Sequence, residues 1–199
     1  MSNLVIVYYS QTGNVHALAA EAAKTAESAG AEVRLRRARE LAPAEAIASN
    51  EKWAQHAKAT EDIPEASLED LEWADAIMLG TPTRYGLPTS QLKQFIDMTG
   101  PLWEAGKLIN KVATSFTSSA TSHGGQESTI LAINNTFYHW GCIIVGPGYA
   151  DPIQFDPEVG NPYGASHVGS GGLPSEKTLS GIAFQTKRVL DITDKLVAS

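Results

Sequence analysis

Short apolar runs alternate with amphipathic segments along most of the chain. Residues 4–9 form a continuous apolar run rich in β-branched and aromatic side chains, which indicates a strand buried on both faces. Apolar residues then recur at helical spacing from Val15 to Ala29, and Gly30 ends the predicted helix. Residues 31–36 alternate apolar and charged side chains. One polar face is typical of a strand at the edge of a sheet.

The second half of the chain continues the same alternation. Further strands are predicted over 74–80, 111–117 and 142–145. Helices are predicted from Pro88 to a stop at Gly100-Pro101, over 127–139, and onward from the cap residue Ser175. Strands that alternate with helices favour a doubly wound α/β fold. We therefore expect one domain over 1–199, with three layers around a five-stranded parallel sheet in the order 2-1-3-4-5.

Two segments are long for simple connections between these elements. Residues 38–72 contain helix-forming Ala and Glu, so we expect helical turns there. Residues 146–174 are rich in Gly, Pro, Tyr and Asp. Both segments are interpreted as excursions near the active-site end of the sheet or at subunit contacts. Ordinary surface loops are the alternative.

Composition narrows the class of protein. The 199 residues are 43% hydrophobic and the net charge is −7, which disfavours nucleic acid as the main ligand. The single cysteine, Cys142, excludes an intramolecular disulfide and suits a reducing compartment. No signal peptide and no apolar stretch of ~20 residues is visible, so the prediction is a cytoplasmic protein without membrane insertion. The five histidines lack ligand-like spacing, so we predict no metal site and name no catalytic residue.

A phosphate-binding loop is predicted directly after the first strand. In an open α/β sheet, ligands bind beyond the carboxyl ends of the strands where the strand order reverses, and strand one lies at that point. The loop runs into a helix N-terminus, whose free amides and dipole attract a phosphate. It contains no Lys or Arg, which favours a small, permanently held cofactor such as FMN over a nucleotide with Mg²⁺. The alternative is a polar turn. The loop consists of Ser10, Gln11, Thr12, Gly13, Asn14 and Val15.

Two further polar loops, 80–88 and 116–127, follow the third and fourth strands and should lie beside the first loop. Tyr85, Gly86 and backbone amides there are suited to the flat ring and polar edge of a flavin. Arg84 is suited to stabilising the negative charge of a reduced flavin, although a surface salt bridge is the alternative for this side chain. Sequences of the P-loop and dinucleotide-binding types are absent after the first strand.

The chain resembles the WrbA-type NAD(P)H:quinone oxidoreductases of the flavodoxin-like superfamily over nearly its whole length. The most specific similarities are the sequences YYSQTG at 8–13, GTPTRYG at 80–86, TGPLW at 99–103 and HGGQE at 123–127. The resemblance implies an FMN cofactor, NADH or NADPH as electron donor, a quinone as acceptor, and two-electron reduction. It also implies a homotetramer in which a neighbouring subunit completes each site.

Carried onto this sequence, the resemblance implies a specific set of site residues. Trp103 and His139 are implied at the substrate pocket. Trp140 stands where the family often has a histidine close to the flavin, and Thr12 stands where it often has an aromatic residue. The implied FMN contacts comprise residues 10–15 together with Pro82, Thr83, Arg84, Tyr85, Gly86, Ser118, Ser119, Ala120, Thr121, Gly124, Gly125 and Trp140.

The working hypothesis is therefore a quinone reductase with a ping-pong mechanism. Two alternatives of other classes stay open at this point. A flavodoxin-like electron carrier would pass single electrons, and a regulatory module would bind another protein.

Overall fold

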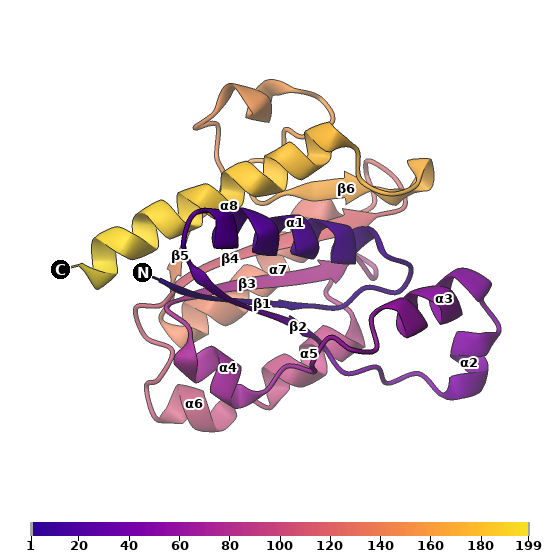
Figure 1. Cartoon of the computed structure of the whole chain (residues 1–199), viewed down its shortest axis with the longest axis horizontal. Helices are drawn as coiled ribbons and strands as arrows, with labels where there is room; N and C mark the ends of the chain where they lie inside the picture. Colours follow the sequence, from indigo (N-terminus) through magenta and orange to yellow (C-terminus); the bar gives the residue numbers. More distant parts are fainter. Residues whose placement is uncertain (1, 199) are drawn as a thin grey trace.

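The computed structural model describes residues 2–198 and confirms the predicted sheet (Figure 1). Parallel strands lie in the order β2-β1-β3-β4-β5, so the predicted order 2-1-3-4-5 and the edge position of the second strand are both correct. The strands are β1 (Asn3–Tyr8), β2 (Glu32–Arg37), β3 (Ala76–Pro82), β4 (Val112–Ser119) and β5 (Ile143–Ile144). Their carboxyl ends all point to the right in Figure 1.

The central strands are apolar on both faces because each face supports a separate core. Leu4, Ile6 and Tyr8 of β1 belong to one hydrophobic cluster, together with side chains of α1 (Asn14–Ser28) and α8 (Glu176–Val197). Val5 and Val7 belong to the other, together with side chains of four further helices, α4 (Leu68–Trp73), α5 (Ser90–Asp97), α6 (Gly100–Glu104) and α7 (Gln126–Trp140). The alternation along one strand therefore places helices on both sides of the sheet, giving three layers.

The remaining helices agree largely with the sequence pattern. They are α2 (Ala44–Ala48), α3 (Glu51–Ala59), α4 (Leu68–Trp73), α5 (Ser90–Asp97), α6 (Gly100–Glu104) and α7 (Gln126–Trp140). The expected turns in 38–72 are thus α2, α3 and α4. The stop at Gly100-Pro101 was wrong, because α5 ends at Asp97 and Pro101 lies in the first turn of α6, where a missing amide costs nothing.

The fifth strand position is occupied by two separate segments. β5 pairs with the start of β4 at Val112–Ala113, whereas β6 (Ser166–Val168) pairs with its end at Thr117–Ser119. Short 3-10 helices η1 (Pro152–Phe155) and η2 (Gly169–Gly171) flank β6 along the chain. The segment 146–174 is therefore an insertion within the fifth strand, and it returns to the sheet at the carboxyl end of β4.

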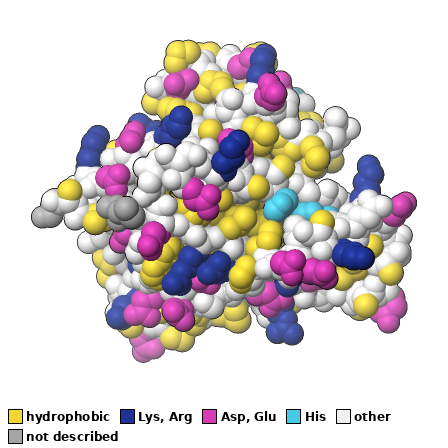
Figure 2. Space-filling model, in the orientation of Figure 1, with side chains coloured by type: hydrophobic (Ala, Val, Ile, Leu, Met, Phe, Trp, Pro, Cys, Tyr) yellow, Lys and Arg dark blue, Asp and Glu magenta, His cyan; other side chains and the backbone are white. Residues whose placement is uncertain are grey.

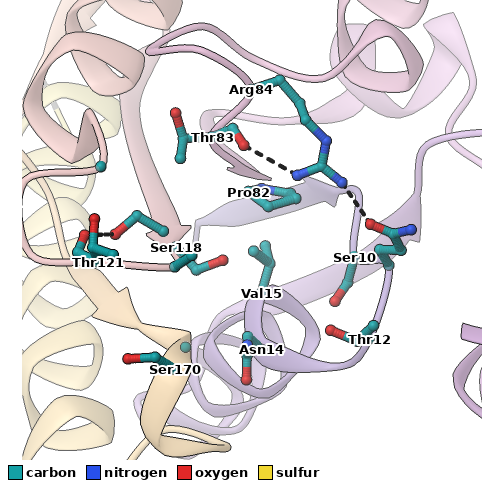
Figure 3. Close-up of a pocket in the computed structure, with 15 residues that line it drawn as sticks. Ser10, Thr12, Asn14, Val15, Pro82, Thr83, Arg84, Ser118, Thr121 and Ser170 are labelled. Carbon is teal, nitrogen blue, oxygen red and sulfur yellow. Dashed lines mark hydrogen bonds between the residues drawn. The ribbon is translucent and has the colours of Figure 1, made fainter. Parts of the chain in front are cut away.

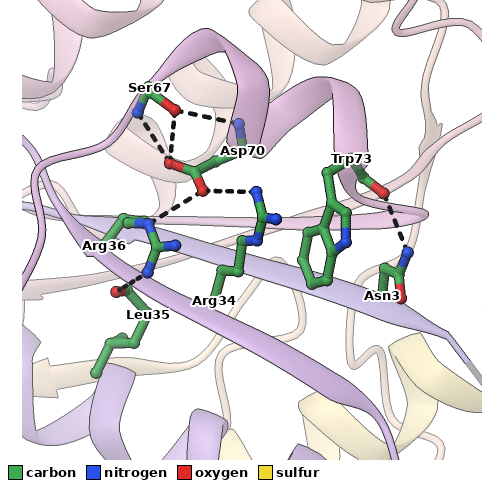
Figure 4. Close-up of polar contacts among 7 residues, drawn as sticks. All are labelled: Asn3, Arg34, Leu35, Arg36, Ser67, Asp70 and Trp73. Atoms are coloured by element: carbon green, nitrogen blue, oxygen red, sulfur yellow. Dashed lines mark hydrogen bonds and ion pairs between the residues drawn. The ribbon is translucent and has the colours of Figure 1, made fainter.

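The edge strand β2 is fastened to α4 by one buried carboxylate (Figure 4). Asp70 accepts from the guanidinium groups of Arg34 (3.1 Å) and Arg36 (3.0 Å), which both project from β2. Its second oxygen accepts from the amide (3.0 Å) and hydroxyl (2.9 Å) of Ser67, forming a capping box at the start of α4. Charged side chains on β2 thus cover the sheet edge instead of leaving it open.

The surface carries charges of both signs without a single-signed patch on the face shown in Figure 2. Among the described residues, no helix combines the length and apolar character needed to cross a membrane. Cys142 is half-buried, its thiol donates to the carbonyl oxygen of Leu108, and burial raises its pKa to about 12. Cys142 is therefore a small packing residue and not a reactive thiol.

Candidate cofactor site

The three predicted loops meet around one cavity at the carboxyl ends of β1, β3 and β4 (Figure 3). The cavity has a volume of about 350 Å³. Loops from three separate parts of the sequence thus form one surface, as the position of strand one in the sheet predicts. Its lining includes Ser10, Gln11, Thr12, Asn14, Val15, Pro82, Thr83, Arg84, Ser118, Ser119, Ala120, Thr121 and Gly124, all of them predicted site residues.

The first loop presents unpaired backbone amides to the cavity. Gly13 takes a left-handed conformation (φ 105°) as the N-cap of α1, and its amide donates to the Ser10 hydroxyl (3.1 Å). The first helical bond is donated by Ala17 to the carbonyl oxygen of Gly13 (2.9 Å). The amides of Asn14 and Val15 therefore have no carbonyl partner within the helix, and they carry the positive end of its dipole. This donor set suits a phosphate monoester.

The second loop is a tight turn that places Arg84 beside the first loop. The backbones of Arg84 and Leu87 exchange two hydrogen bonds (2.8 and 3.0 Å), while Tyr85 (φ 55°) and Gly86 (φ 77°) occupy the left-handed region between them. Tyr85 is fully exposed, so its ring points away from the cavity. Neither Tyr85 nor Gly86 is among the cavity-lining residues of this chain.

Arg84 is the cation nearest to the pocket. Its guanidinium donates to Gln11 Oε1 (2.6 Å) on the first loop and to the carbonyl oxygen of Thr83 (3.1 Å). Figure 3 shows the side chain reaching across the cavity mouth. Within residues 2–198 it forms no salt bridge, so the alternative that it serves as a surface ion pair is not realised here. Its charge stays available to an anionic ligand.

The third side of the cavity is the end of β4 and the turn after it. Ser118 and Ser119 still belong to the strand, and the Ser118 carbonyl oxygen accepts from the Thr83 amide (2.8 Å). Ser119 Oγ donates to the Thr121 carbonyl oxygen (2.7 Å) and accepts from Gln126 (2.8 Å). A Cβ on Gly124 would lie 2.9 Å from Ser119 Cβ, which requires glycine there. These contacts fix a rigid polar wall.

Gly169 and Ser170 also line the cavity, although the sequence analysis assigned neither residue to the site. They follow β6, which brings η2 against the first loop. A Cβ built on Gly169 would lie 2.4 Å from Asn14 Nδ2, so the absence of a side chain permits this approach. The only indication of this contact in the sequence is the glycine content of the segment 146–174, which does not predict that the segment packs against the first loop.

Several predicted contacts lie outside the cavity of the same chain. Gly13 and Gly125, the N-cap residues of α1 and α7, are not among the residues that line it. Trp140 is at the far end of the 15-residue helix α7, roughly 20 Å along its axis from the cavity end. Its side chain is buried edge-on against Phe137 and does not line the cavity of its own chain, so the contact of this indole with the flavin stays a prediction.

Trp103 and His139 lie at that same far end. The Trp103 indole donates to the His139 carbonyl oxygen (2.9 Å), and both side chains are exposed. Trp103 and His139 therefore lie next to each other, and neither lines the cavity of its own chain. Trp103 is 56% exposed, so its side chain is accessible to another molecule.

His16, His56 and Tyr8, which lie behind the first loop, are neutral near pH 7. Burial lowers the pKa of His16, and burial together with the nearby His16 lowers the pKa of His56 to about 4. Burial raises the pKa of Tyr8, whose hydroxyl lies 2.7 Å from His16 Nδ1. The cavity thus offers neutral donors and one guanidinium. Among the described residues no cluster of three metal-binding side chains occurs. The residues present suit FMN.

Comparisons with known proteins agree with this assignment. The profile of the family described as NADPH-dependent FMN reductase matches residues 3–155. A protein of Deinococcus radiodurans named NAD(P)H dehydrogenase (quinone) is 44% identical over 98% of this chain and 96% of its own length. A protein of Geobacter sulfurreducens with the same name is 44% identical, covering 98% of each chain.

Solved structures give the same result for the fold. The crystal structure of a WrbA-like flavodoxin from Agrobacterium tumefaciens superposes with a TM-score of 0.69 at 25% identity, covering 98% of this chain and 99% of that one. These similarities confirm the family resemblance inferred from the sequence motifs. The chain belongs to the NADPH-dependent FMN reductase family, and within it to the group of the NAD(P)H dehydrogenases (quinone).

Proposed function

We propose that the protein is an FMN-dependent NAD(P)H:quinone oxidoreductase that works by a ping-pong mechanism. The observation that carries the proposal is the single cavity formed by three strand-end loops, with helix-start amides at one end and Arg84 at the mouth. Names of relatives that are 44% identical over nearly the full length support the reaction. Bound FMN supplies hydride acceptance from NADH or NADPH followed by two-electron transfer to a quinone.

The chain's own residues supply binding and orientation. The amides of Asn14 and Val15 and the hydroxyls of Ser10 and Thr12 would hold the phosphate, since they surround the start of α1. The wall formed by Ser118 to Thr121 would face the flat ring. Neutral amide and hydroxyl donors suit the phosphate monoester of a small cofactor better than a nucleotide bound with Mg²⁺.

Arg84 would act electrostatically on the bound ring. Its guanidinium is anchored by Gln11 and by the Thr83 carbonyl oxygen, so the charge is already in place before reduction. A fixed positive charge stabilises the anionic, two-electron reduced form over the oxidised one. No protein group in the cavity is needed as an acid or base in this scheme.

We further propose a homotetramer in which Trp103 and His139 serve the cavity of a neighbouring subunit. These residues lie at the opposite end of α7 from their own cavity, and Trp103 is exposed. A second copy is the arrangement that brings an exposed indole to a flavin site. The outward apolar side chains of the same region, Ile109 and Tyr138, support contact between subunits.

The test uses purified protein loaded with FMN. Oxidation of NADH or NADPH with benzoquinone as acceptor is expected, and it should depend on FMN. Double-reciprocal plots of the initial rate against the concentration of one substrate, made at several concentrations of the other, should give parallel lines if the scheme is ping-pong. An FMN-bound protein that is inert with both nicotinamides would overturn the proposal, and a large stable semiquinone on stepwise reduction would favour an electron carrier instead.

A further inference from the structure

The loop from Ser10 to Val15 is weakly fastened by its own contacts. Among the described residues, the only hydrogen bond within the loop joins the Gly13 amide to the Ser10 hydroxyl (3.1 Å). One bond does not fix six residues, because each ordered residue loses backbone entropy that its contacts have to offset. The geometry that a phosphate needs therefore depends on what packs around the loop.

Helix α3, in the excursion at 38–72, packs against the back of this loop. His56 Nδ1 lies 3.7 Å from the position that a Cβ on Gly13 would take. The His56 ring also lies 5.4 Å from the ring of His16 in the first turn of α1. A helix from a distant part of the chain is thus in contact with both the loop and the helix that receives the phosphate.

One carboxylate holds α3 in this place. Glu40 Oε2 accepts from the hydroxyl of Tyr9 (2.8 Å) and from the indole of Trp53 (3.2 Å) on α3. Tyr9 is buried and directly precedes the loop. Glu40 Oε1 accepts from Gln91 (2.7 Å) in the first turn of α5, which follows the Arg84 turn, and from two local amides, those of Leu41 (2.8 Å) and Ala42 (3.0 Å).

All five partners donate to Glu40, which is the arrangement that suits an ionised carboxylate. Burial favours the protonated acid, but the hydrogen bonds from Gln91, Ala42, Tyr9 and Leu41 outweigh burial and hold the pKa of Glu40 below its ordinary value. An amide at this position would turn an NH₂ group toward some of the donors, leaving them unpaired.

We propose that Glu40 is a positioning residue for the FMN phosphate, which acts by docking α3 and α5 against Tyr9 and so supports the Ser10–Val15 loop from behind. It touches neither the cofactor cavity nor any reacting atom. The proposal rests on FMN being the cofactor, as in the proposed function, and not on the reaction catalysed.

The test compares FMN with riboflavin, which lacks the phosphate. In Glu40→Gln the dissociation constant of FMN, measured by quenching of flavin fluorescence, should rise at least about tenfold, the effect of one charge-assisted hydrogen bond. Riboflavin should lose less, so the preference for FMN over riboflavin falls. A merely structural defect would weaken both flavins equally.

Asp70→Asn is the matched control, because Asp70 is also an ionised carboxylate that fastens β2 and its neighbours but lies outside the cavity. It should lower stability and leave the FMN to riboflavin preference unchanged. The proposal fails if Glu40→Gln keeps the wild-type preference, or if Asp70→Asn changes it equally.

Two milder variants decide the matter if Glu40→Gln does not fold. Trp53→Phe and Gln91→Met each remove one donor to Glu40 and should each weaken FMN about threefold. Unchanged FMN affinity in both would overturn the proposal. A wild-type protein that binds FMN but oxidises neither nicotinamide would refute the proposed reaction and leave this inference standing, whereas failure to bind FMN would refute both.

Discussion

Replacing Asp70 by asparagine should destabilise the protein by removing the charge that joins β2 to α4. Asp70 is almost fully buried, with its side chain 4% exposed, and accepts from Arg34, Arg36 and Ser67. Breaking a buried ion pair costs about 3–5 kcal/mol. The two arginines are 28% and 20% exposed and regain some hydration, so we expect a loss of about 2–3 kcal/mol.

The assay is thermal and urea unfolding of the apo-protein at pH 7. For a chain of this size, a loss of 2–3 kcal/mol lowers Tm by roughly 4–12 °C. Glu69→Gln is the matched control, because Glu69 is exposed in the same helix turn and should change stability by less than about 1 kcal/mol.

The effect should also depend on pH with a defined sign. Burial by itself would raise the pKa of Asp70, but hydrogen bonds from Ser67 and Arg36 outweigh it and hold that pKa below its ordinary value. A depressed folded-state pKa contributes stability that is complete above the unfolded value of about 3.9 and is lost as the pH falls through the lower folded value. The difference between wild type and Asp70→Asn should therefore shrink below about pH 4. Equal stability at pH 7, or a difference that persists undiminished in acid, would refute the reasoning.

Three further changes test the cavity and its surroundings. Gly169→Ala should weaken FMN binding several-fold in a fluorescence titration, because its Cβ would lie 2.4 Å from Asn14 Nδ2. Gly171→Ala is the control, because a Cβ there meets nothing within 4 Å, and equal FMN affinities of the two variants would contradict the packing of η2. Arg84→Met should shift the two-electron potential of bound FMN to a more negative value by about 20 mV, since one charge at an exposed site contributes about 1 kcal/mol. A positive shift measured by spectroelectrochemistry would argue against the assigned role of Arg84. Trp103→Ala should keep the FMN dissociation constant within about twofold and lower kcat/KM for benzoquinone by up to about tenfold, which is the range of one aromatic contact. An unchanged kcat/KM would contradict the assignment of Trp103 to the substrate pocket.

The sheet and its ligand edge were predictable because local pattern and topology agree. The apolar run that became β1 alternates between two cores, which is why both of its faces are apolar. The turn after it is a polar loop at the start of a helix, and general rules for open α/β sheets place a ligand there. Thirteen lining residues of the first three loops followed from these rules and from the family motifs.

The parts that were not predictable depend on contacts between distant segments. β6 has three residues, too few for a periodic pattern, so the pairing that brings Gly169 to Asn14 left almost no trace in the sequence. Glu40 gave no indication of its role, because its partners Tyr9, Trp53 and Gln91 come from three different elements.

Trp140 shows a different kind of limit. A motif assigns a residue to a site but does not say which subunit's site it serves. Within one chain, a 15-residue helix that begins at the cavity ends far from it, and Trp140 packs in the core at that opposite end. Family motifs therefore agree with the cavity lining at the strand ends, whereas the flavin contact of Trp140 stays a prediction.

The most direct test of the central claim is the visible absorbance of the FMN-loaded protein through both half-reactions, followed without oxygen. We predict that NADH or NADPH bleaches the flavin absorbance, and that benzoquinone added after removal of the nicotinamide restores it in one two-electron step. A flavin that stays oxidised with both nicotinamides, or a reduced flavin that benzoquinone does not reoxidise, would contradict the account.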